Sequence, residues 1–347
     1  MKKQRNTRTK GHGKKVGLVS YKGKNILITG GLGFLGSNLA CELVKLGAHV
    51  TILDSLHPRY GGNLFNIEEC KRKIKVIIGD TRDRDIVRQA VKNKDIIFNF
   101  AAQVSYIDSP LIPHEDLDVN CRGHLNILES IKENDSKPRV IFSSSRLVIG
   151  INNVNPVNEN HPTNPLSLYG IHKLAGEKYH NIYWKLHKIP TIILRITNPF
   201  GKKQQIKHNK YSLPGWFMRQ AMEGKEITIF GDGKQVRDYI YVSDIVDAFL
   251  HIGMAKGVEG EIFNLGYGKS YRFKDMVEAI VKEVGRGKIR YIPWPDNYEK
   301  IETGHFEIDI SKIKKATGWK PTTTLKEGIT DMVSYYKKHK NRYIDDN

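Results

Sequence analysis

The sequence predicts an α/β fold, in which a doubly wound parallel sheet carries a smaller C-terminal α/β substrate lobe. Short apolar runs alternate with helical patterns through roughly the first 200 residues, which is typical of parallel strands joined by crossover helices. A glycine-rich turn separates the first apolar run from the first helical pattern. Beyond Gly201 the alternation gives way to polar loops and isolated amphipathic helices.

The elements follow in chain order. Apolar runs predict strands over residues 25–29, 49–54, 75–78, 96–100, 140–143 and 191–194. Apolar residues at helical spacing predict helices over 37–46, 83–91, 119–133 and 169–187, and farther along over 216–223, 244–254 and 325–338. We therefore expect a sheet domain over residues 24–200, with part of 234–265 packing back onto it, and a lobe formed mainly by residues 201–340.

Composition indicates a folded globular chain. Of its 347 residues 39% are hydrophobic and 27% charged, which argues against a disordered, collagenous or coiled-coil protein. No run approaches the about 18 apolar residues that a membrane-spanning helix needs, and no apolar stretch follows the basic N-terminus. We expect no membrane insertion and no secretory signal.

The three cysteines, Cys41, Cys70 and Cys121, lie far apart in the sequence, with no C-x-x-C pair. This spacing predicts neither a disulfide framework nor a metal site, and it favours a reducing, cytoplasmic location.

The net charge of +19 raises the question of a polyanionic partner. Nine basic residues and no acidic ones lie within residues 1–24, so about half of the excess belongs to the N-terminus. We predict a basic, disordered tail over residues 1–23, and we do not expect nucleic acid to be the main ligand.

The glycine-rich turn has the pattern G-x-x-G-x-x-G, formed by Gly30, Gly33 and Gly36. It follows a predicted strand and opens a predicted helix, which is the context in which glycines let the backbone approach a pyrophosphate. Asp54 ends the next predicted strand, where a carboxylate can accept hydrogen bonds from an adenosine ribose and disfavour NADP. Arg59 lies close enough to leave NADP as an alternative.

Tyr169 and Lys173 are four residues apart at the start of a predicted helix, hence on one face. A tyrosine is a poor base at neutral pH, and a nearby cation that stabilises its phenolate makes it a better one. Such pairs are also common on ordinary surface helices, so this pair carries weight only together with the other motifs.

Taken together, the motifs resemble those of the extended short-chain dehydrogenase/reductases that act on nucleotide sugars. The glycine turn, Asp54, Asn-Phe-Ala-Ala-Gln at 99–103, Ser-Ser-Ser-Arg-Leu-Val-Ile-Gly at 143–150 and Tyr-x-x-x-Lys occur in the family's order. Further matches at 194–201, 231–244 and 318–321 extend the resemblance over residues 24–338. The chain is most similar to the UDP-glucose 4-epimerase-like members of this NAD-dependent epimerase/dehydratase family.

The resemblance implies a Rossmann-type sheet domain with NAD as its cofactor. The glycines would cradle the pyrophosphate, Asp54 would hold the adenosine ribose, Asp80 would meet the adenine, and Asn120 would be a polar support. The cofactor-binding residues that it implies are Gly30, Gly33, Phe34, Leu35, Gly36, Asp54, Asp80, Thr81, Ala101, Ala102, Gln103, Asn120, Tyr169 and Lys173.

The resemblance also assigns the reacting groups. Ser145 would hydrogen-bond the sugar hydroxyl that is oxidised, and Tyr169 would take its proton. Lys173 would bind the nicotinamide ribose and lower the pKa of Tyr169. Asn198 and Arg237 would contact the substrate diphosphate, unless they only cap a loop or form a surface ion pair. No metal is implied.

Three departures from the family pattern stand out. Ile149 occupies a position that usually holds a tyrosine, and Glu299 and Lys300 lie where an arginine for the second phosphate is common. Arg146 and Leu147 follow Ser145 where dehydratases and decarboxylases carry an acidic group, which disfavours those chemistries.

The sequence therefore predicts an NAD-dependent nucleotide-sugar 4-epimerase, with a UDP-hexose as the favoured substrate and a homodimer as the expected assembly. The alternatives are a nucleotide-4-keto-sugar reductase or C4 dehydrogenase with the same Ser145, Tyr169 and Lys173. A 4,6-dehydratase or an inactive binding protein fits less well.

Overall fold

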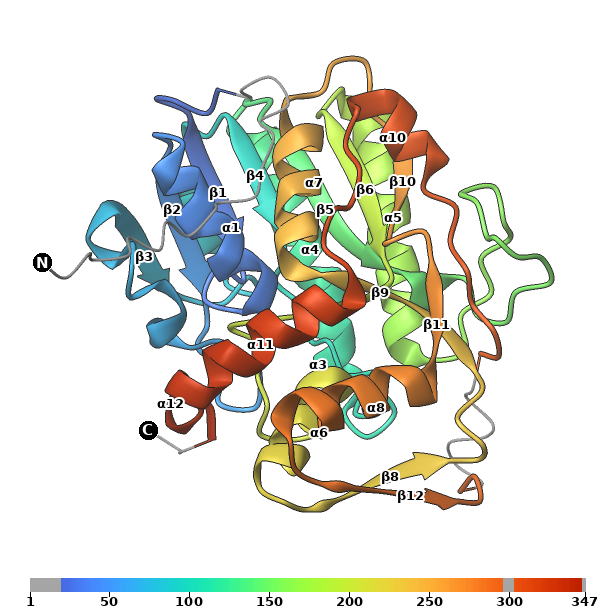
Figure 1. Cartoon of the computed structure of the whole chain (residues 1–347). Coiled ribbons are helices and arrows are strands. Elements are labelled where there is room, and N and C mark those ends of the chain that lie inside the picture. Colours follow the sequence, from blue (N-terminus) through green and yellow to red (C-terminus); the bar gives the residue numbers. More distant parts are fainter. Residues whose placement is uncertain (1–19, 296–302, 345–347) are drawn as a thin grey trace, which may run out of the picture.

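The computed structural model describes residues 20–295 and 303–344. Its centre is a seven-stranded parallel sheet with the strand order β10-β6-β5-β4-β1-β2-β3 (Figure 1). The strands are β1 (Asn25–Thr29), β2 (His49–Asp54), β3 (Ile74–Ile78), β4 (Ile96–Asn99), β5 (Arg139–Ser145), β6 (Thr191–Ile196) and β10 (Ile262–Leu265). This is the Rossmann-type sheet that the sequence predicts, with the C-terminal β10 as an added edge strand.

Helices cover both faces of the sheet. They are α1 (Phe34–Lys45), α2 (Arg84–Ala90), α3 (Pro113–Leu117), α4 (Gly123–Glu133), α5 (Leu168–His187) and α7 (Val242–Met254). Alternate residues of β1 point to opposite faces, so Ile26 and Ile28 join the core beneath α1 and α7, whereas Leu27 joins a second core with Val87 and Ile127 beneath α2 and α4. Burial on both faces explains why the strands are continuous apolar runs.

Most of the remaining elements form a lobe below the sheet in Figure 1, whereas α10 lies beside β10 at the upper right. The two small sheets of the lobe have the orders β11-β9-β7 and β12-β8. The strands are β7 (Asn198–Phe200), β8 (Glu226–Phe230), β9 (Val236–Tyr241), β11 (Ser270–Arg272) and β12 (Lys288–Ile292), and the helices are α6 (Leu213–Met222), α8 (Phe273–Val284), α10 (Ser311–Thr317), α11 (Leu325–His339) and α12 (Asn341–Ile344). Short helical turns cover Leu64–Ile67, Lys71–Lys73, Asp118–Arg122 and Arg146–Val148.

Local signals set the helix boundaries. The Ser167 hydroxyl accepts a hydrogen bond from the Gly170 amide at 3.1 Å and caps α5, and the Asp83 carboxylate caps α2 in the same way. The predicted helix over 119–133 is instead a π-helical turn at Asp118–Arg122 that leads into α4. No helix among the described residues is long and apolar enough to cross a membrane.

The prediction of no disulfide is wrong. Cys41 in α1 and Cys70 are bonded, with their Cα atoms 5.6 Å apart, and only Cys121 is free and buried. The two cysteines are 29 residues apart in the sequence, and they meet because the segment after β2 folds back against α1. The inference of a reducing compartment therefore loses the support of the cysteines.

The folded part of the chain includes a residue that the sequence assigned to the tail. Tyr21, which the sequence placed in the basic tail, is fully buried, and its hydroxyl donates to the Leu250 carbonyl of α7 at 2.9 Å. Most of the predicted tail, residues 1–19, lies outside the described residues, as do Glu299 and Lys300.

Candidate active site

A cavity of about 580 Å³ lies between the carboxyl ends of the sheet strands and the lobe. The strand order reverses between β1 and β4, which is where α/β sheets of this kind bind ligands. Fifteen of the seventeen predicted site residues line this cavity: Gly30, Gly33, Phe34, Leu35, Gly36, Asp54, Asp80, Thr81, Ala101, Ala102, Ser145, Tyr169, Lys173, Asn198 and Arg237.

The two other predicted residues, Gln103 and Asn120, do not line the cavity but support its wall. The Gln103 side chain is fully buried and bonds to the backbone of Ser105. The Asn120 amide donates to the Gln103 carbonyl at 2.9 Å. Both therefore hold the loop after β4 in place.

The glycine turn is shaped so that no side chain fits in it. Gly30 has a φ of +67°, and a Cβ there would lie 2.9 Å from the Ala101 nitrogen. A Cβ on Gly36 would lie 2.4 Å from the Gly30 carbonyl oxygen. Gly33 is the N-terminal residue before α1, whose first turn contains no acidic side chain, so the turn suits an anion such as a pyrophosphate.

Asp54 lies at the end of β2, next to the glycine turn, and its side chain is hydrogen-bonded to the backbone of that turn. Its carboxylate accepts hydrogen bonds from the Leu32 and Leu56 amides, both at 2.9 Å. Burial raises the pKa of Asp54, and these two bonds oppose that rise. Since a carboxylate has four lone-pair sites, capacity remains for ribose hydroxyls.

Asp80 lies at the other end of the predicted adenosine site. Burial acts to raise its pKa, but the paired Arg82 guanidinium more than compensates, so the pKa is lowered and the carboxylate stays charged. Arg82 Nη2 lies 2.7 Å from Asp80 Oδ2. These two carboxylate acceptors and the glycine cradle fit NAD.

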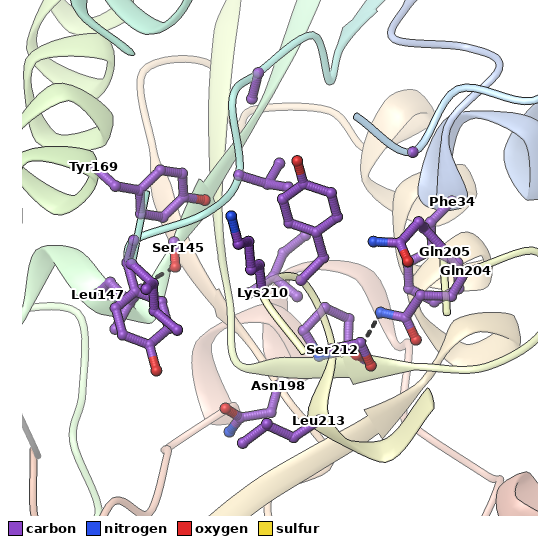
Figure 2. Close-up of a pocket in the computed structure, with 18 of the residues that line it drawn as sticks. Phe34, Ser145, Leu147, Tyr169, Asn198, Gln204, Gln205, Lys210, Ser212 and Leu213 are labelled. Carbon is purple, nitrogen blue, oxygen red and sulfur yellow. Dashed lines mark hydrogen bonds between the residues drawn. The ribbon is translucent and has the colours of Figure 1, made fainter. Parts of the chain in front are cut away.

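Ser145 and Tyr169 meet at the sheet side of the cavity (Figure 2). Ser145 is the last residue of β5, and Tyr169 and Lys173 are one turn apart near the start of α5. The Lys173 ammonium donates to the Ser143 carbonyl at 2.9 Å and lies 5.9 Å from the centre of the Tyr169 ring. β5 and α5 therefore bring together the three predicted catalytic side chains.

Burial dominates the electrostatics of this group. It raises the pKa of Tyr169, and a hydrogen bond with Ser145 opposes that rise. It lowers the pKa of Lys173 to about 8. In this structure Ser145, and not Lys173, opposes the effect of burial on the Tyr169 pKa. The lowering of the Tyr169 pKa by Lys173 therefore stays a prediction for the loaded site.

A buried acid beside these groups escaped the sequence reasoning. Asp116 of α3 is completely buried, with its Oδ1 2.5 Å from the His172 Nδ1 and its Oδ2 without a hydrogen-bond partner. Its negative charge raises the pKa of both Tyr169 and Lys173. The sequence feature that could have identified Asp116 is its position four residues, or about one helical turn, before the predicted site residue Asn120.

The substrate side of the cavity lies at the junction of β7 and β9. The Asn198 amide donates to the Asp238 carbonyl at 2.6 Å, and Arg237 donates to the Val236 carbonyl at 2.9 Å. Arg146, which the sequence marked only as a departure, also lines the cavity and donates to Asn198. Ile149 is fully buried in the main core, so the usual tyrosine position here carries a core side chain.

Aromatic side chains form the end of the cavity that lies in the lobe. They are Trp216, Phe217, Phe230, Phe273 and Trp294. Scattered over four segments of the sequence, they gave no local pattern that could identify them. Among the described residues, no group of three or more His, Cys, Asp or Glu side chains could hold a metal ion.

Comparisons with known proteins agree with this architecture. Residues 26–266 match the NAD dependent epimerase/dehydratase family. The chain is 36% identical over 316 residues to a putative UDP-glucose 4-epimerase of Methanocaldococcus jannaschii, covering 90% of this chain and 99% of that protein.

Two solved structures show the same fold. The UDP-glucose 4-epimerase of Thermotoga maritima with UDP-glucose superposes with a TM-score of 0.83 at 29% identity, covering 90% of this chain and 99% of that one. The dTDP-glucose 4,6-dehydratase of Bacillus anthracis in complex with NAD gives a TM-score of 0.80 at 26% identity, covering 92% and 98%. The chain therefore belongs to the NAD-dependent epimerase/dehydratase family, and its cofactor is NAD.

Proposed function

We propose that this protein is a nucleotide-sugar 4-epimerase that acts on a UDP-hexose. The observation that carries the proposal is that Ser145, Tyr169 and Lys173 line the same cavity as the glycine turn. Arg146 and Leu147 line the cavity directly after Ser145, so the β5 end offers no acid for the later proton transfers of a dehydratase. The similarity to UDP-glucose 4-epimerases supports the same choice.

The residues present account for the proton transfers. Tyr169 takes the proton of the sugar hydroxyl at carbon 4, while Ser145 holds that hydroxyl through a hydrogen bond. NAD, when bound, supplies the two-electron acceptor for this oxidation and the donor for its reversal. In the NAD-loaded site we expect the positive charge of Lys173 to favour the tyrosinate, and Tyr169 returns the proton after the sugar has turned over within the cavity.

The test is incubation of the NAD-loaded protein with UDP-, dTDP-, GDP- and CDP-hexoses, with products identified by NMR. We expect UDP-glucose and UDP-galactose, or a substituted pair, to interconvert. A deuterium label at carbon 4 should stay in the product without exchange into water. Stoichiometric NADH accumulation would instead identify a dehydrogenase, and reduction only of 4-keto sugars would identify a reductase.

Tyr169→Phe removes the proposed base and keeps the ring. Since general base catalysis contributes about 10²- to 10⁴-fold, kcat should fall by that factor while substrate affinity is largely kept. Tyr183→Phe is the matched control, because Tyr183 lies on the same helix and bonds to Glu129 instead of lining the cavity. Full activity of Tyr169→Phe would contradict the mechanism for epimerase, reductase and dehydrogenase alike.

We also infer a homodimer formed through α5. Ile171, Ile182 and Leu186 recur at helical spacing on its outer side and are 47%, 48% and 68% exposed. Leu117 of the adjacent α3 is 45% exposed. An apolar stripe of this kind is typical of a buried interface. Ile182→Glu should yield a monomer in light scattering, whereas Leu64→Glu, at an exposed site away from α5, should not.

A further inference from the structure

A second cavity lies beside α1, and none of the residues that line it belongs to the wall of the first cavity. Cys41 and Cys70, which form the disulfide, both line it. We propose that this disulfide is a thiol-exchange site, at which a small anionic thiolate attacks Cys70 and Cys41 leaves as a thiolate. The inference goes beyond the proposed function, because it involves neither the sugar nor the chemistry at carbon 4.

The cavity gives a small molecule access to the disulfide. Among its lining residues, the side chains of Lys45, Glu68 and Glu69 are 59%, 64% and 57% exposed. The cysteines are more deeply buried, and Cys70 is 8% exposed whereas Cys41 is 1% exposed. Thiol exchange requires a direct approach to one sulfur. Cys70 is therefore the end of the bond that an incoming thiolate reaches.

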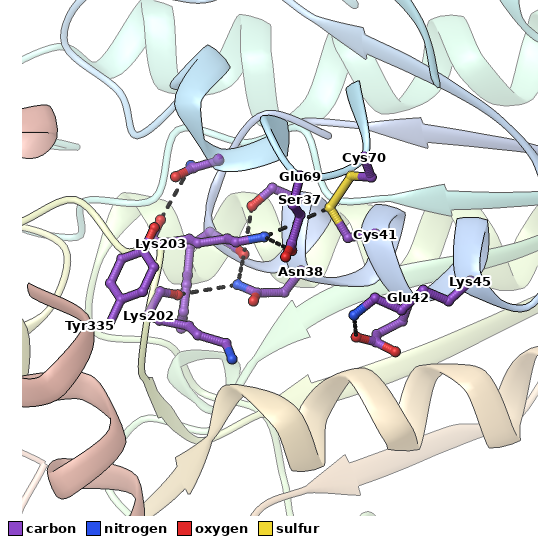
Figure 3. Close-up of polar contacts among 12 residues, drawn as sticks. Ser37, Asn38, Cys41, Glu42, Lys45, Glu69, Cys70, Lys202, Lys203 and Tyr335 are labelled. Atoms are coloured by element: carbon purple, nitrogen blue, oxygen red, sulfur yellow. Dashed lines mark hydrogen bonds and ion pairs between the residues drawn. A yellow bond between two sulfur atoms is a disulfide. The ribbon is translucent and has the colours of Figure 1, made fainter. Parts of the chain in front are cut away.

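The other sulfur lies beside a buried cation (Figure 3). The Lys203 ammonium donates to Cys41 Sγ at 3.8 Å and lies 2.8 Å from Glu69 Oε1. Burial lowers the pKa of Lys203, and the bond to Glu69 opposes that lowering. A neighbouring lysine stabilises a thiolate, and a sulfur that is more stable as a thiolate leaves faster. Attack on Cys70, with Cys41 as the leaving group, is therefore the favoured direction.

The charge around the cavity suits an anionic thiol. The two acidic side chains that line it are both paired, Glu68 with Lys71 at 3.9 Å and Glu69 with Lys203. The cations outnumber the acids, which favours the approach of a thiol that carries carboxylates, such as glutathione. With their ion-pair partners, the charged residues of the cavity are five cations and three acids: Lys45, Lys71, Arg72, Lys73 and Lys203 against Glu42, Glu68 and Glu69.

The exchange balances in two steps. In the first, the external thiolate forms a bond to Cys70 Sγ, the bond between the two protein sulfurs breaks, and its electron pair leaves on Cys41 Sγ. In the second, another external thiolate attacks the external sulfur of the mixed disulfide, and Cys70 leaves as a thiolate. Two external thiolates are thereby oxidised to one disulfide, and the protein disulfide is reduced by two electrons. The reverse sequence closes the bond again.

The bond is placed so that its state can affect the cofactor site. In the segment that leads to Cys70, the Asn66 side chain donates to the Leu32 carbonyl at 2.8 Å, and the Asn63 amide donates to the same carbonyl at 3.1 Å. Leu32 belongs to the glycine turn. The disulfide fastens this segment to α1, which begins directly after that turn. Opening the bond should therefore weaken the binding of NAD.

The test measures the rate of disulfide reduction in the full-length, NAD-loaded protein. Glutathione, which is anionic, is compared with cysteamine, which is cationic, at equal thiolate concentration and low ionic strength. Samples are trapped by alkylation, and their peptides are analysed by mass spectrometry. We expect glutathione to react about 2- to 5-fold faster, and its adduct to appear on Cys70 while Cys41 is alkylated. Cys121 should stay unmodified, because burial raises the pKa of its thiol to about 11.

Two pairs of variants test the cations separately. Lys203→Met should slow reduction by both thiols about 3- to 10-fold, because Cys41 loses the cation beside it. Lys202→Met is the matched control, since Lys202 is the neighbouring lysine but its side chain is 40% exposed. Lys73→Met should slow glutathione but not cysteamine, whereas Lys75→Met, at an exposed position of β3 outside the cavity, should slow neither.

The effect on the cofactor site is measured by fluorescence titration of NAD into the oxidised and the reduced protein. The Kd for NAD should rise about 5-fold or more on reduction, as expected for two coupled sites. Cys70→Ser should show the same rise without any thiol present. Adding glutathione to this variant should change the Kd no further.

Five results would overturn the proposal, and the first four need no variant. Three free thiols in protein kept under air would show that the bond does not form. Reduction by thioredoxin but not by glutathione would assign the site to a protein dithiol. A glutathione adduct on Cys41 would reverse the roles of the two sulfurs, and equal Kd values for NAD would separate the bond from the glycine turn. An unchanged rate in Lys203→Met would remove the assisted leaving group. Since no readout is turnover of a sugar, failure of the proposed function leaves this test intact.

Discussion

Lys173 shows how strongly burial acts on a single group in this cavity. It is 3% exposed, and burial lowers its pKa to about 8, while the negative charges of Asp116 and Glu177 oppose that change. The lysine that must carry a positive charge is therefore close to losing it at mildly alkaline pH. Since the Lys173 ammonium would hold the nicotinamide ribose, the affinity for NAD should depend on whether Lys173 is protonated.

We expect the affinity for NAD to fall as the pH rises through about 8, because the ammonium form is then lost. Asp116→Asn removes a buried negative charge that raises the lysine pKa, so the fall should begin at lower pH. The measurement is the Kd for NAD from pH 6 to 10. The titratable groups around Lys173 are Asp116, Cys121, Glu177 and Tyr169. An unchanged midpoint in Asp116→Asn would show that the carboxylate does not act on Lys173.

Asp54 combines cofactor selection with support of the glycine turn. Asp54→Ala should reduce the preference for NAD over NADP, because the carboxylate that repels an additional phosphate is gone. It should also lower the free energy of unfolding by about 1.5–3 kcal/mol, because the Leu32 and Leu56 amides lose a charged acceptor. Fluorescence titration and urea denaturation measure the two effects. Asp85→Ala, at an exposed site on α2, should change neither.

At the scale of elements, the β1–α1 unit depends on backbone contact. Gly36→Ala would place a Cβ 2.4 Å from the Gly30 carbonyl oxygen, and the backbone atoms there cannot move aside as a flexible side chain would. The free energy of unfolding should fall by about 1–3 kcal/mol, and NAD binding should be lost. Gly61→Ala also lies at the cavity, but its Cβ meets Gln205 Cβ at an ordinary 3.6 Å, so it should be tolerated.

The disulfide between Cys41 and Cys70 also connects two elements, because it joins α1 to the segment after β2. Figure 3 shows Cys41 and Cys70 beside Lys203, whose ammonium lies 2.8 Å from Glu69 Oε1. The Asn38 amide of α1 donates to the Lys202 carbonyl at 3.2 Å. Three segments that are distant in the sequence therefore meet behind the glycine turn, which explains why none of these contacts could be predicted.

At the scale of the whole molecule, the N-terminal boundary is testable. Deleting residues 1–19 should leave turnover and the free energy of unfolding unchanged, because their basic, glycine-rich sequence predicts a solvated tail that adds nothing to the core. Deleting residues 1–22 should cost about 3–5 kcal/mol, because it removes the fully buried Tyr21 and its bond to Leu250. Tyr21→Ala in the full chain isolates this contribution. Equal stability of both deletions would place the boundary after Tyr21.

The sequence by itself predicted the parallel sheet, the glycine turn and the Tyr169–Lys173 pair, because each depends on local spacing, and the family resemblance added Ser145 to that pair. Apolar runs identify buried parallel strands, and a four-residue separation places Tyr169 and Lys173 on one helical face. Only the tertiary structure decided that β10 extends the sheet, that Cys41 meets Cys70, and that Arg146 reaches Asn198. These outcomes depend on packing between segments that are distant along the chain, which spacing and composition do not encode.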